Sequence, residues 1–537
     1  MLDYYMFDKS CKNLLVRGVN WIGDAVMTLP ALRVLRKAMP ETKITLLVKP
    51  WVAPIFEKDP NIDEIIIYGD EYKGIIGKIK LSRVLNKKDF CSAILFQNAF
   101  DAALITFLGG IKERVGYNRD SRGFLLTKAV PLPENKAHQI YYYLNLLKEI
   151  EINPVDIINR VNAEYSEPYI YLTLDERLHA RKILSGMKRP IIGINPGAAY
   201  GSAKRWFPEK FAEVAKRFIK DTNGSVVIFG GKNEVDVAQE IEIRMIRSWE
   251  YKNFSTSQPH NFLTSHLLNL AGRTSLRELI AIISECDVFV TNDSGPMHIA
   301  YAVRTPLVAI FGSTDPELTG PIEGGNVVIK ADVDCAPCFE RTCKSDMRCM
   351  YGITSDDVYY GIKKILPDRP AVFFDRDGTL CRDVGYLDKY DDFHIFSNID
   401  SVRLLKERGF KLIGVSNQSG ISRGIIEEDF VNKINRIFIE RYDFDGFYYC
   451  PHHPDEHCPC RKPEPGMLLW ARAEHRVNLK RSYMVGDKQT DMLIAKAVGA
   501  KGILVQTGEA KESANADYIA RDLKEAVDFI SRNNGNK

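Results

Sequence analysis

The sequence has no long hydrophobic run. None of its apolar stretches approaches the ~18 residues that a membrane-spanning helix requires. Its first 18 residues, MLDYYMFDKSCKNLLVRG, lack the basic segment followed by an apolar core that is typical of a secretory signal peptide. Both absences argue against a membrane-spanning or secreted protein, and we expect a cytoplasmic one.

A large charge of one sign is also missing. Among 537 residues, 73 Lys and Arg nearly balance 70 Asp and Glu, so the formal net charge is +3. This balance argues against a protein that coats nucleic acid, and we expect no nucleic-acid partner. Low-complexity tracts and repeats of 20 to 50 residues are absent as well. At roughly 150 residues a domain, the length predicts about three or four globular domains.

The eleven cysteines are not distributed as framework pairs. Most fall into two groups with ligand-like spacing, which favours metal or thiol chemistry in a reducing compartment over disulfides. One group has the spacing C-x2-C-x4-C-x5-C, which by itself could hold zinc or an iron–sulfur cluster. Whether this group binds a metal stays open at this point; its members are Cys335, Cys338, Cys343 and Cys349.

Short apolar runs alternate with helix-period stretches in three successive series. The alternation predicts an α/β fold of parallel sheets covered by helices on both faces. We predict three domains, 1–165, 166–367 and 368–537, with a cleft between the two similar halves that come first. Pro370 ends a short linker before the third series. The polar segment 248–266 suggests no chemistry.

The third series places polar residues just past apolar runs, in the stretches FFDRDGTL, GVSNQSG and MVGDKQTDM. Open α/β folds bind ligands at this carboxyl edge of the sheet. The pair Asp375 and Asp377, with Asp487 after a later run, is therefore expected at this edge.

Together with CPCRKPEPGM, these stretches resemble the haloacid dehalogenase (HAD)-like phosphohydrolases, in the branch that acts on histidinol phosphate and on heptose 1,7-bisphosphate. The resemblance implies that Asp375 attacks phosphorus while Asp377 serves as general acid and base. It implies a Mg2+ site with Asp375, Asp377 and Asp487 as ligands. Asp491 either supports that site or is an ordinary carboxylate on a surface helix. The residues that it assigns to the substrate and its phosphate are Ser416, Asn417, Arg461, Lys462 and Lys488.

The stretch CPHHPDEHCPC offers one imidazole and three thiolates, from Cys450, His452, Cys458 and Cys460. This donor set fits a closed tetrahedral zinc site, which is structural because no coordination position remains for a substrate. Unpaired loop cysteines are the alternative. Zinc here would stiffen the loop that leads into Lys462.

The stretches WIGDAVMTLPAL, AKRW, NDSGPMHIA and FGSTDPELTGP lie between residues 12 and 366. They resemble the family 9 glycosyltransferases, in the branch that transfers heptose to lipopolysaccharide. The resemblance implies the GT-B fold, in which two Rossmann-like domains face a cleft. It also implies ADP-heptose as donor, a lipopolysaccharide inner-core acceptor, peripheral contact with the inner membrane, and no metal for the transfer.

Within this part, we expect Asp24 to be the general base on the acceptor hydroxyl; its alternative role is to cap the helix 24–38. NDSGPMHIA reads as a strand, a turn and the start of a helix, whose amides and dipole attract the donor diphosphate. The residues expected to bind the donor are Lys204, Asp293, Ser294, Gly295, His298, Thr314, Thr319 and Gly320.

The segment KERVGYNRDSRG carries a basic cluster that is either part of the acceptor site or a solvated face; it consists of Lys112, Arg114, Arg119 and Arg122. The whole chain is thus expected to be bifunctional, with heptosyl transfer in front and removal of the 7-phosphate of heptose 1,7-bisphosphate behind. Two alternatives stay open. The last domain could hydrolyse histidinol phosphate, or the front half could bind a nucleotide sugar without turnover.

Overall fold

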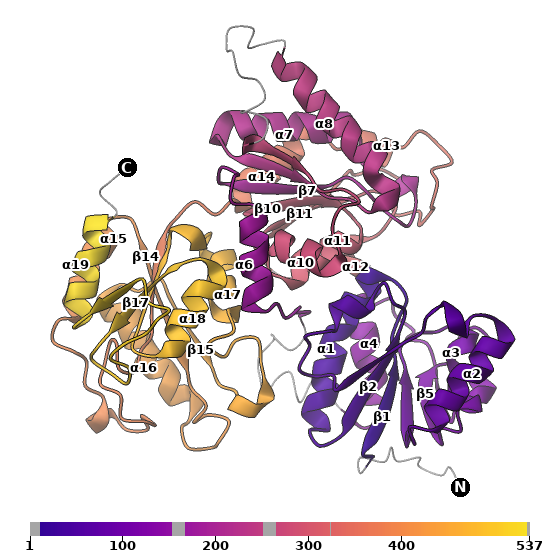
Figure 1. Cartoon of the computed structure of the whole chain (residues 1–537), viewed down its shortest axis with the longest axis horizontal. Coiled ribbons are helices and arrows are strands. Elements are labelled where there is room, and N and C mark those ends of the chain that lie inside the picture. Colours follow the sequence, from indigo (N-terminus) through magenta and orange to yellow (C-terminus); the bar gives the residue numbers. More distant parts are fainter. Residues whose placement is uncertain (1–10, 153–166, 251–264, 323, 534–537) are drawn as a thin grey trace. The chain divides into compact units, whose positions relative to one another are not determined.

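A computed structural model describes the protein over residues 11–152, 167–250, 265–322 and 324–533. Most of the polar segment 248–266 lies outside these residues. The chain forms two compact units, Met1–Lys364 and Ile365–Lys537 (Figure 1). The first unit contains two six-stranded parallel sheets and the second unit contains one.

The first sheet is built from β1 (Asn13–Arg17), β2 (Lys43–Val48), β3 (Glu64–Ile67), β4 (Ser92–Leu95), β5 (Glu113–Tyr117) and β6 (Lys128–Val130). The helices α1 (Ile22–Ala38) and α4 (Gln139–Lys148) cover one face, and α2 (Gly74–Asn86) and α3 (Phe100–Leu108) cover the other (Figure 1). Successive residues of β1 point to opposite faces, so Leu14 and Val16 join one buried core while Leu15 joins the other.

The second sheet contains β7 (Ile191–Asn195), β8 (Ser225–Ile228), β9 (Leu267–Asn269), β10 (Val288–Asn292), β11 (Leu307–Phe311) and β12 (Asn326–Lys330). The helices in this part of the chain are α6 (Leu174–Ile183), α7 (Pro208–Thr222), α8 (Val235–Glu250), α10 (Leu276–Glu285), α11 (Gly295–Ala302), α12 (Pro316–Thr319), α13 (Arg348–Tyr351) and α14 (Ser355–Ile365).

The third sheet forms the second unit, from β13 (Ala371–Phe374), β14 (Lys411–Asn417), β15 (Gly446–Cys450), β16 (Tyr483–Gly486), β17 (Lys501–Val505) and β18 (Tyr518–Ala520). Its helices are α15 (Arg403–Glu407), α16 (Glu428–Tyr442), α17 (Gly466–His475), α18 (Gln489–Val498) and α19 (Leu523–Asn533).

All three sheets have the same strand order. Numbered within each sheet, the strands run 3-2-1-4-5-6, and every pair is parallel. The chain direction across the sheet therefore reverses between strands 1 and 4, and ligands of doubly wound folds bind at the carboxyl ends there. This confirms the α/β class and marks three positions for sites: after β1 and β4, after β7 and β10, and after β13 and β16.

Helix ends follow local sequence signals. Thr173 caps α6 and exchanges hydrogen bonds with Glu176 in a capping box. Ser275 and Glu278 do the same for α10. The left-handed residue Asn223, at φ 55°, ends α7. These signals set where the connecting loops, and hence the site residues, begin.

One pair of cysteines departs from the expected metal or thiol chemistry: Cys11 and Cys91 form a disulfide with a Cα–Cα distance of 5.8 Å. Cys11 precedes β1 and Cys91 precedes β4, and these strands are neighbours, with Leu14 beside Ser92. For this pair the expectation was wrong, because residues 80 positions apart in sequence begin adjacent strands.

Within the described ranges, the helices are all too short or too polar to cross a membrane.

Candidate active sites

Asp24 lies in the first turn of α1, directly beyond the carboxyl end of β1. The N-cap position of this helix is Trp21, so Asp24 does not occupy the cap. Burial raises the pKa of Asp24 to about 6, with Lys204 opposing the shift and Asp293 adding to it. A carboxylate with this pKa accepts a proton more readily than an exposed aspartate and is still ionised at pH 7.

Lys204 and Asp293 meet at the carboxyl edge of the second sheet. The Lys204 ammonium lies 2.5 Å from Asp293 Oδ2, and the Thr314 hydroxyl donates to the same oxygen at 2.6 Å. The backbone N–H of Trp206 donates to the side chain of Asn292, the last residue of β10. The structure thus brings together Lys204, Asp293 and Thr314, three of the residues predicted to bind the nucleotide-sugar donor. The Trp206 hydrogen bond anchors the turn that carries Lys204.

Ser294 is the N-cap residue of α11, and Gly295 is its first residue. The Ser294 hydroxyl is 3.1 Å from the Thr291 hydroxyl and accepts from the Asn195 amide at 3.4 Å. The start of α11 therefore lies next to Asp293, as the motif predicts, and Asn195 is an additional polar residue at the end of β7 that sequence reasoning missed.

Two glycines let α1 and α11 pack closely. A Cβ at Gly23 would lie 2.6 Å from the His298 ring, and one at Gly295 would lie 3.0 Å from Ile22. His298 is buried, and burial lowers its pKa to about 4, so its imidazole is neutral at pH 7. This packing brings the helix that carries Asp24 against the helix of the predicted donor site.

Thr319 and Gly320 end the short helix α12 after β11. The Gly320 carbonyl oxygen lies 2.8 Å from Nε2 of His138, which caps α4. The loop is thereby held against the half of the unit that carries Asp24.

The basic cluster in and around β5 is not uniformly exposed. Arg122 is fully buried and donates to the Tyr117 carbonyl at 3.0 Å and to the Asn98 side chain at 3.2 Å. Arg114 donates to the Leu125 carbonyl at 2.7 Å. Both guanidinium groups hold loops together, a role that neither sequence interpretation of the cluster included.

In the second unit, Asp375 follows β13, Asp487 follows β16 and Asp491 lies on α18. A carboxylate oxygen from each lies within 4.8 Å of the other two, and all three residues are buried. Burial raises the pKa of Asp375 and of Asp487 to about 6, and neighbouring carboxylates add to both shifts. The interpretation of Asp491 as a surface-helix carboxylate is wrong, because its side chain is fully buried.

Lys462 supplies the positive charge at this cluster. Its ammonium lies 2.7 Å from Asp375 and 2.6 Å from Asp491, and it donates to the Val415 carbonyl at 3.2 Å. Burial alone would lower the pKa of Lys462, but the two carboxylates outweigh it and raise the pKa. Three buried carboxylates beside one ammonium leave excess negative charge, which a hard divalent cation would neutralise.

Buried polar atoms without a hydrogen-bond partner among the described residues occur in this cluster and in the segments next to it in sequence: Asp487 Oδ1, Thr379 Oγ1 after Gly378, and Arg461 Nη1 before Lys462. Buried polar groups are normally paired, so these atoms indicate a place for a cation and an anionic ligand. Gly378, at φ +91°, keeps the space beside Asp487 open, since a Cβ there would lie 2.5 Å from its carboxylate. Thr379 stands in the DGTL stretch, but nothing in its spacing singled it out.

Asp377 is outside this carboxylate group. The Arg376 guanidinium donates to both of its oxygens at 3.0 Å, and the Gln418 amide donates at 2.8 Å. Burial opposes ionisation of Asp377, yet Arg376 and Gln418 lower its pKa overall. The carboxylate is therefore ionised and fixed beside Ser416, whose hydroxyl lies 3.4 Å away.

Asn417 and Lys488 also contact protein groups. The Asn417 side chain accepts from the Lys462 backbone N–H at 3.0 Å and donates to the Lys462 carbonyl at 3.3 Å. Lys488 precedes α18 and lies 3.0 Å from Asp383. Asn417 thus positions the segment that carries Lys462.

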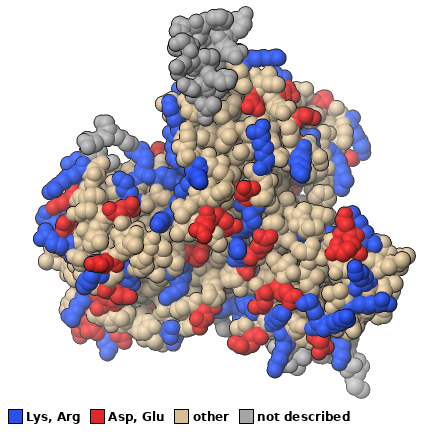
Figure 2. Space-filling view, in the orientation of Figure 1, with Lys and Arg blue, Asp and Glu red and all other residues tan. Residues whose placement is uncertain are grey.

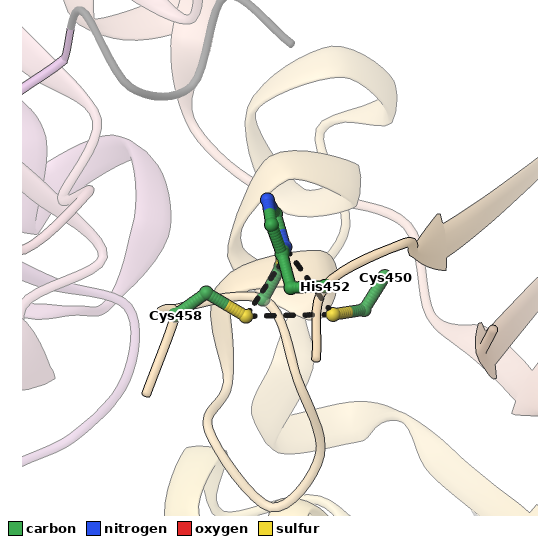
Figure 3. A group of neighbouring side chains, drawn as sticks. Cys450, His452 and Cys458 are labelled. Carbon is green, nitrogen blue, oxygen red and sulfur yellow. Dashed lines mark hydrogen bonds between the residues drawn. The ribbon is translucent and has the colours of Figure 1, made fainter. Parts of the chain in front are cut away.

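The loop after β15 brings Cys450, His452, Cys458 and Cys460 together, all buried, with one donor atom from each within 4.8 Å of the others. Figure 3 shows the Cys450 and Cys458 sulfurs facing each other at 3.4 Å, with the His452 ring beside them. The Nδ1 atom of His452 is 3.4 Å from Cys450 and 3.0 Å from the Cys460 sulfur. Three thiols and one imidazole converging in this way fit the donor set of structural zinc.

The other cysteine group is arranged differently. Cys335 and Cys338 are exposed, Cys343 is half-buried and Cys349 is buried. Among the described residues, no three of these four sulfurs all lie within 4.8 Å of one another. The group is nonetheless local, because burial and then the thiols of Cys335, Cys343 and Cys338 raise the pKa of Cys349.

The first unit thus has two Rossmann-type sheets, with Asp24 beyond the first and Lys204 near the start of α11 beyond the second. This arrangement fits a nucleotide-sugar transferase. Residues 78–348 match the model of glycosyltransferase family 9 (heptosyltransferase). The chain is 30% identical over 327 residues to lipopolysaccharide heptosyltransferase 2 of Escherichia coli, covering 59% of this chain and 87% of that protein. The solved structure of E. coli ADP-heptose lps heptosyltransferase II matches with a TM-score of 0.54 and 28% identity, over 66% of this chain and 98% of the other.

In the second unit, residues 459–526 match the HAD-hydrolase-like model. The chain is 45% identical over 172 residues to D-glycero-beta-D-manno-heptose-1,7-bisphosphate 7-phosphatase of Yersinia pestis, covering 29% of this chain and 91% of that protein. The chain belongs to glycosyltransferase family 9 through its first unit and to the HAD-like heptose-bisphosphate phosphatases through its second. The expected GT-B and HAD-like folds are thereby confirmed.

Proposed function

We propose that the chain is a bifunctional enzyme of lipopolysaccharide heptose metabolism. The first unit transfers heptose from ADP-heptose to an inner-core acceptor, and the second removes the 7-phosphate of D-glycero-D-manno-heptose 1,7-bisphosphate. Family membership of both units supports the two activities. The observation that carries the proposal is that each unit places an aspartate just beyond the first strand of a sheet and near a lysine: the half-buried Asp24 with Lys204, and the buried Asp375 with Lys462.

In the transferase, Asp24 takes the proton from the acceptor hydroxyl as that oxygen attacks the anomeric carbon. Lys204 and the amides at the start of α11 neutralise the charge that develops on the departing ADP. In this structure the Lys204 ammonium pairs with Asp293. We propose that, once ADP-heptose is bound, the ammonium interacts with the donor diphosphate as well as with Asp293. No metal is needed in this scheme, since a lysine and a helix N-terminus supply the positive charge.

In the phosphatase, Asp375 attacks the phosphorus and forms an aspartyl phosphate, which water then hydrolyses. Asp377, held by Arg376 and Gln418, gives a proton to the leaving oxygen and later takes one from the attacking water. Because Arg376 and Gln418 keep its carboxylate ionised in this structure, the first of these steps requires that the anionic substrate raise the pKa of Asp377 and that this carboxylate pick up a proton on binding. Ser416 and Lys462 bind the transferring phosphoryl oxygens, and the unpaired Nη1 of Arg461 is available to a substrate phosphate.

Two metal ions belong to this proposal. Asp375, Asp487 and Asp491 would hold Mg2+, which neutralises the charge between the phosphate and the attacking carboxylate. Asp377 was also predicted as a ligand; both of its oxygens accept from Arg376, and it is not part of the carboxylate group that would hold the ion. Zinc bound by the Cys450 group would fix the loop that leads into Lys462.

Neither alternative function is favoured. Two relatives of the second unit, from Yersinia pestis and Photorhabdus laumondii, are named as phosphatases of heptose 1,7-bisphosphate. A binding module without turnover would not need Asp24 beside Lys204 and the start of α11.

We further propose domain limits at 1–165, 166–367 and 368–537, since β1–β6, β7–β12 and β13–β18 fall within these ranges in turn. A lipid-linked acceptor also implies that a cytoplasmic enzyme works at the face of the inner membrane.

The purified full-length chain tests the proposal directly. ADP release should require both ADP-heptose and a heptose-bearing core acceptor. Phosphate release should be much faster from heptose 1,7-bisphosphate, assayed as both anomers, than from histidinol phosphate. Equal rates on the two phosphate esters would contradict the phosphatase assignment, and ADP release that ignores the acceptor would contradict the transferase assignment.

A further inference from the structure

The donor site proposed for the first unit has little net positive charge. Lys204 pairs with Asp293, and both of these groups act on the pKa of Asp24, so two carboxylates share the region with one ammonium. The N-terminus of α11 contributes only about half an elementary charge. A diphosphate carries more than one negative charge, which these groups together do not balance. A further cation near Lys204 would complete the site.

The loop 331–347, between β12 and α13, carries such a cation at Arg341. The backbone carbonyl of Arg341 accepts from the backbone N–H of Ala203 at 3.0 Å, and Ala203 directly precedes Lys204. A Cβ at Gly201 would clash with the same carbonyl oxygen, so a glycine is needed where the two segments meet. The loop is therefore fixed against the turn that presents Lys204.

Phe339 joins the same loop to two other turns. Its backbone N–H donates to the Ser313 carbonyl at 2.7 Å, and Thr314 is the next residue after Ser313. The Tyr200 hydroxyl donates to the Phe339 carbonyl at 3.0 Å. These contacts, like that of Ala203, use the backbone of the loop, which every residue type supplies. The Arg341 side chain takes no part in holding the loop in place.

The side chains of Arg341 and Lys204 lie against one aromatic ring. The Arg341 guanidinium is 5.1 Å from the centre of the Tyr200 ring, and the Lys204 ammonium is 4.6 Å from the same centre. Tyr200 is 36% exposed, and Arg341 is exposed. In the part of the chain that the structure describes, the guanidinium makes neither a hydrogen bond nor an ion pair. Of the two cations at this ring, only Lys204 thus has an acidic partner.

The loop also contains acidic residues: Asp332, Asp334, Glu340 and Asp346. Glu340 pairs with Lys344 at 2.6 Å, and Asp346 pairs with Arg348 at 3.1 Å. Asp334 is among the groups that raise the pKa of Arg348. Asp332 follows the end of β12, at the start of the loop. The acidic residues on either side of Arg341 in the loop are therefore occupied by other cations.

The surroundings of the loop do not supply a broad positive field either. Asp315, the residue after Thr314, accepts from the Glu317 backbone N–H at 3.0 Å as the N-cap of α12. On the face of the molecule drawn in Figure 2, lysine and arginine side chains are mixed with aspartate and glutamate. Binding of an anion at Lys204 therefore depends on the groups directly beside it.

We propose that Arg341 is a second cation for the donor diphosphate, in addition to Lys204. A guanidinium donates paired hydrogen bonds to phosphate oxygens, and the contact with Tyr200 orients its plane in advance. The inference rests on the proposed function, because the anion is the diphosphate of ADP-heptose. An anionic group of the acceptor would offer the same oxyanion chemistry, and the experiment separates these two sources.

Calorimetric titration of the full-length chain with ADP alone tests this inference. Arg341→Gln removes the guanidinium and keeps the carbonyl that accepts from Ala203. We expect ADP binding to weaken by at least about tenfold, and the KM for ADP-heptose to rise by about as much while the acceptor KM stays unchanged. Arg341→Lys should lie between this variant and the wild type, because an ammonium keeps the charge without the paired geometry.

Arg348→Gln is the matched control, because it removes a nearby cation that is already paired with Asp346. It should bind ADP like the wild type. Phosphate release at the wild-type rate and an unchanged melting profile would show that each variant chain is folded.

An Arg341→Gln chain that binds ADP as tightly as the wild type would overturn the inference. It would also be overturned if only the acceptor KM rose, since Arg341 would then recognise an anionic group of the acceptor. Equal losses of ADP binding in Arg341→Gln and Arg348→Gln would assign the effect to the loop as a whole and overturn it too. If ADP binding depends on Arg341 but no heptosyl transfer occurs, the proposed function fails while the anion site stands.

Discussion

Asp24 and Asp375 occupy equivalent places in two different sheets, each just beyond the first strand at the reversal of strand order. Burial raises the pKa of both to about 6. Their neighbours differ, however. The charged neighbours of Asp24 are Lys204 and Asp293, and these two already form an ion pair with each other. Asp375, in contrast, has two further carboxylates, those of Asp487 and Asp491, within 4.8 Å.

The difference shows that position in the fold does not set the chemistry. A single buried carboxylate opposite a cation can serve as a base without a metal. The same carboxylate surrounded by others becomes part of a cation site, where it needs a metal before it can approach a phosphate. The number of acidic neighbours distinguishes the two proposed active sites of this chain.

The largest expected effect is that of Asp375→Asn. Phosphate release should fall by at least about a thousandfold, because the amide cannot serve as nucleophile. Heptosyl transfer should stay within about twofold of wild type, since the transferase residues lie in the other unit. Parallel assays of both activities on one preparation measure this, and loss of both would show that the units depend on each other.

Asp24→Ala tests the other side of the comparison. Removing the base should slow heptosyl transfer by about a hundredfold to ten-thousandfold. Binding of ADP-heptose, measured by calorimetry, should change little, and phosphate release serves as the internal control. A large loss of donor affinity would instead make Asp24 a structural residue of α1.

Cys458→Ser tests whether the loop proposed to bind zinc supports the carboxylate site of Asp375, Asp487 and Asp491. A hydroxyl is a poor zinc ligand, so bound zinc should be lost and the loop should loosen near Lys462. We expect phosphate release to fall by about tenfold or more, in line with losses at residues that orient a site, with near-normal transfer. Cys286→Ser, a buried cysteine of the other unit, is the matched control. Absence of zinc in the wild type, or a variant with full activity, would refute this role.

The pH dependence of transfer should reveal the pKa of Asp24. Because burial raises this pKa to about 6, the base becomes protonated as the pH falls through that value. The kcat/KM for transfer should then decrease about tenfold for each pH unit below it. An inflection near pH 4 would mean that Asp24 is solvated during catalysis or is not the base.

The smallest effect is expected for Cys338→Ser. Its cysteine group is largely exposed and its sulfurs are not assembled, unlike the Cys450 group. We expect one zinc per wild-type chain and the same content in the variant, measured by metal analysis. A second zinc that disappears with Cys338→Ser would show that the exposed group also binds metal.

The sequence allowed the prediction of much of this organisation, because strand-following motifs such as FFDRDGTL and NDSGPMHIA carry local signals for both fold and chemistry. It did not reveal that Asp491 is buried against Lys462, since an acidic residue on a helix has the same local pattern at a surface. The Cys11–Cys91 pair and the buried Arg122 depend on which strands become neighbours, and spacing along the chain does not carry this information.

The connection between the two compact units has a consequence for the cell. The chain passes from one to the other once, near Lys364; the first unit contains two of the sheets and the second unit contains the third. Joined in this way, the two enzymes are always made in equal numbers and from a single message. Neither can be raised or lowered by transcription or translation without the other, so any adjustment of their relative output has to act on the catalytic rates themselves.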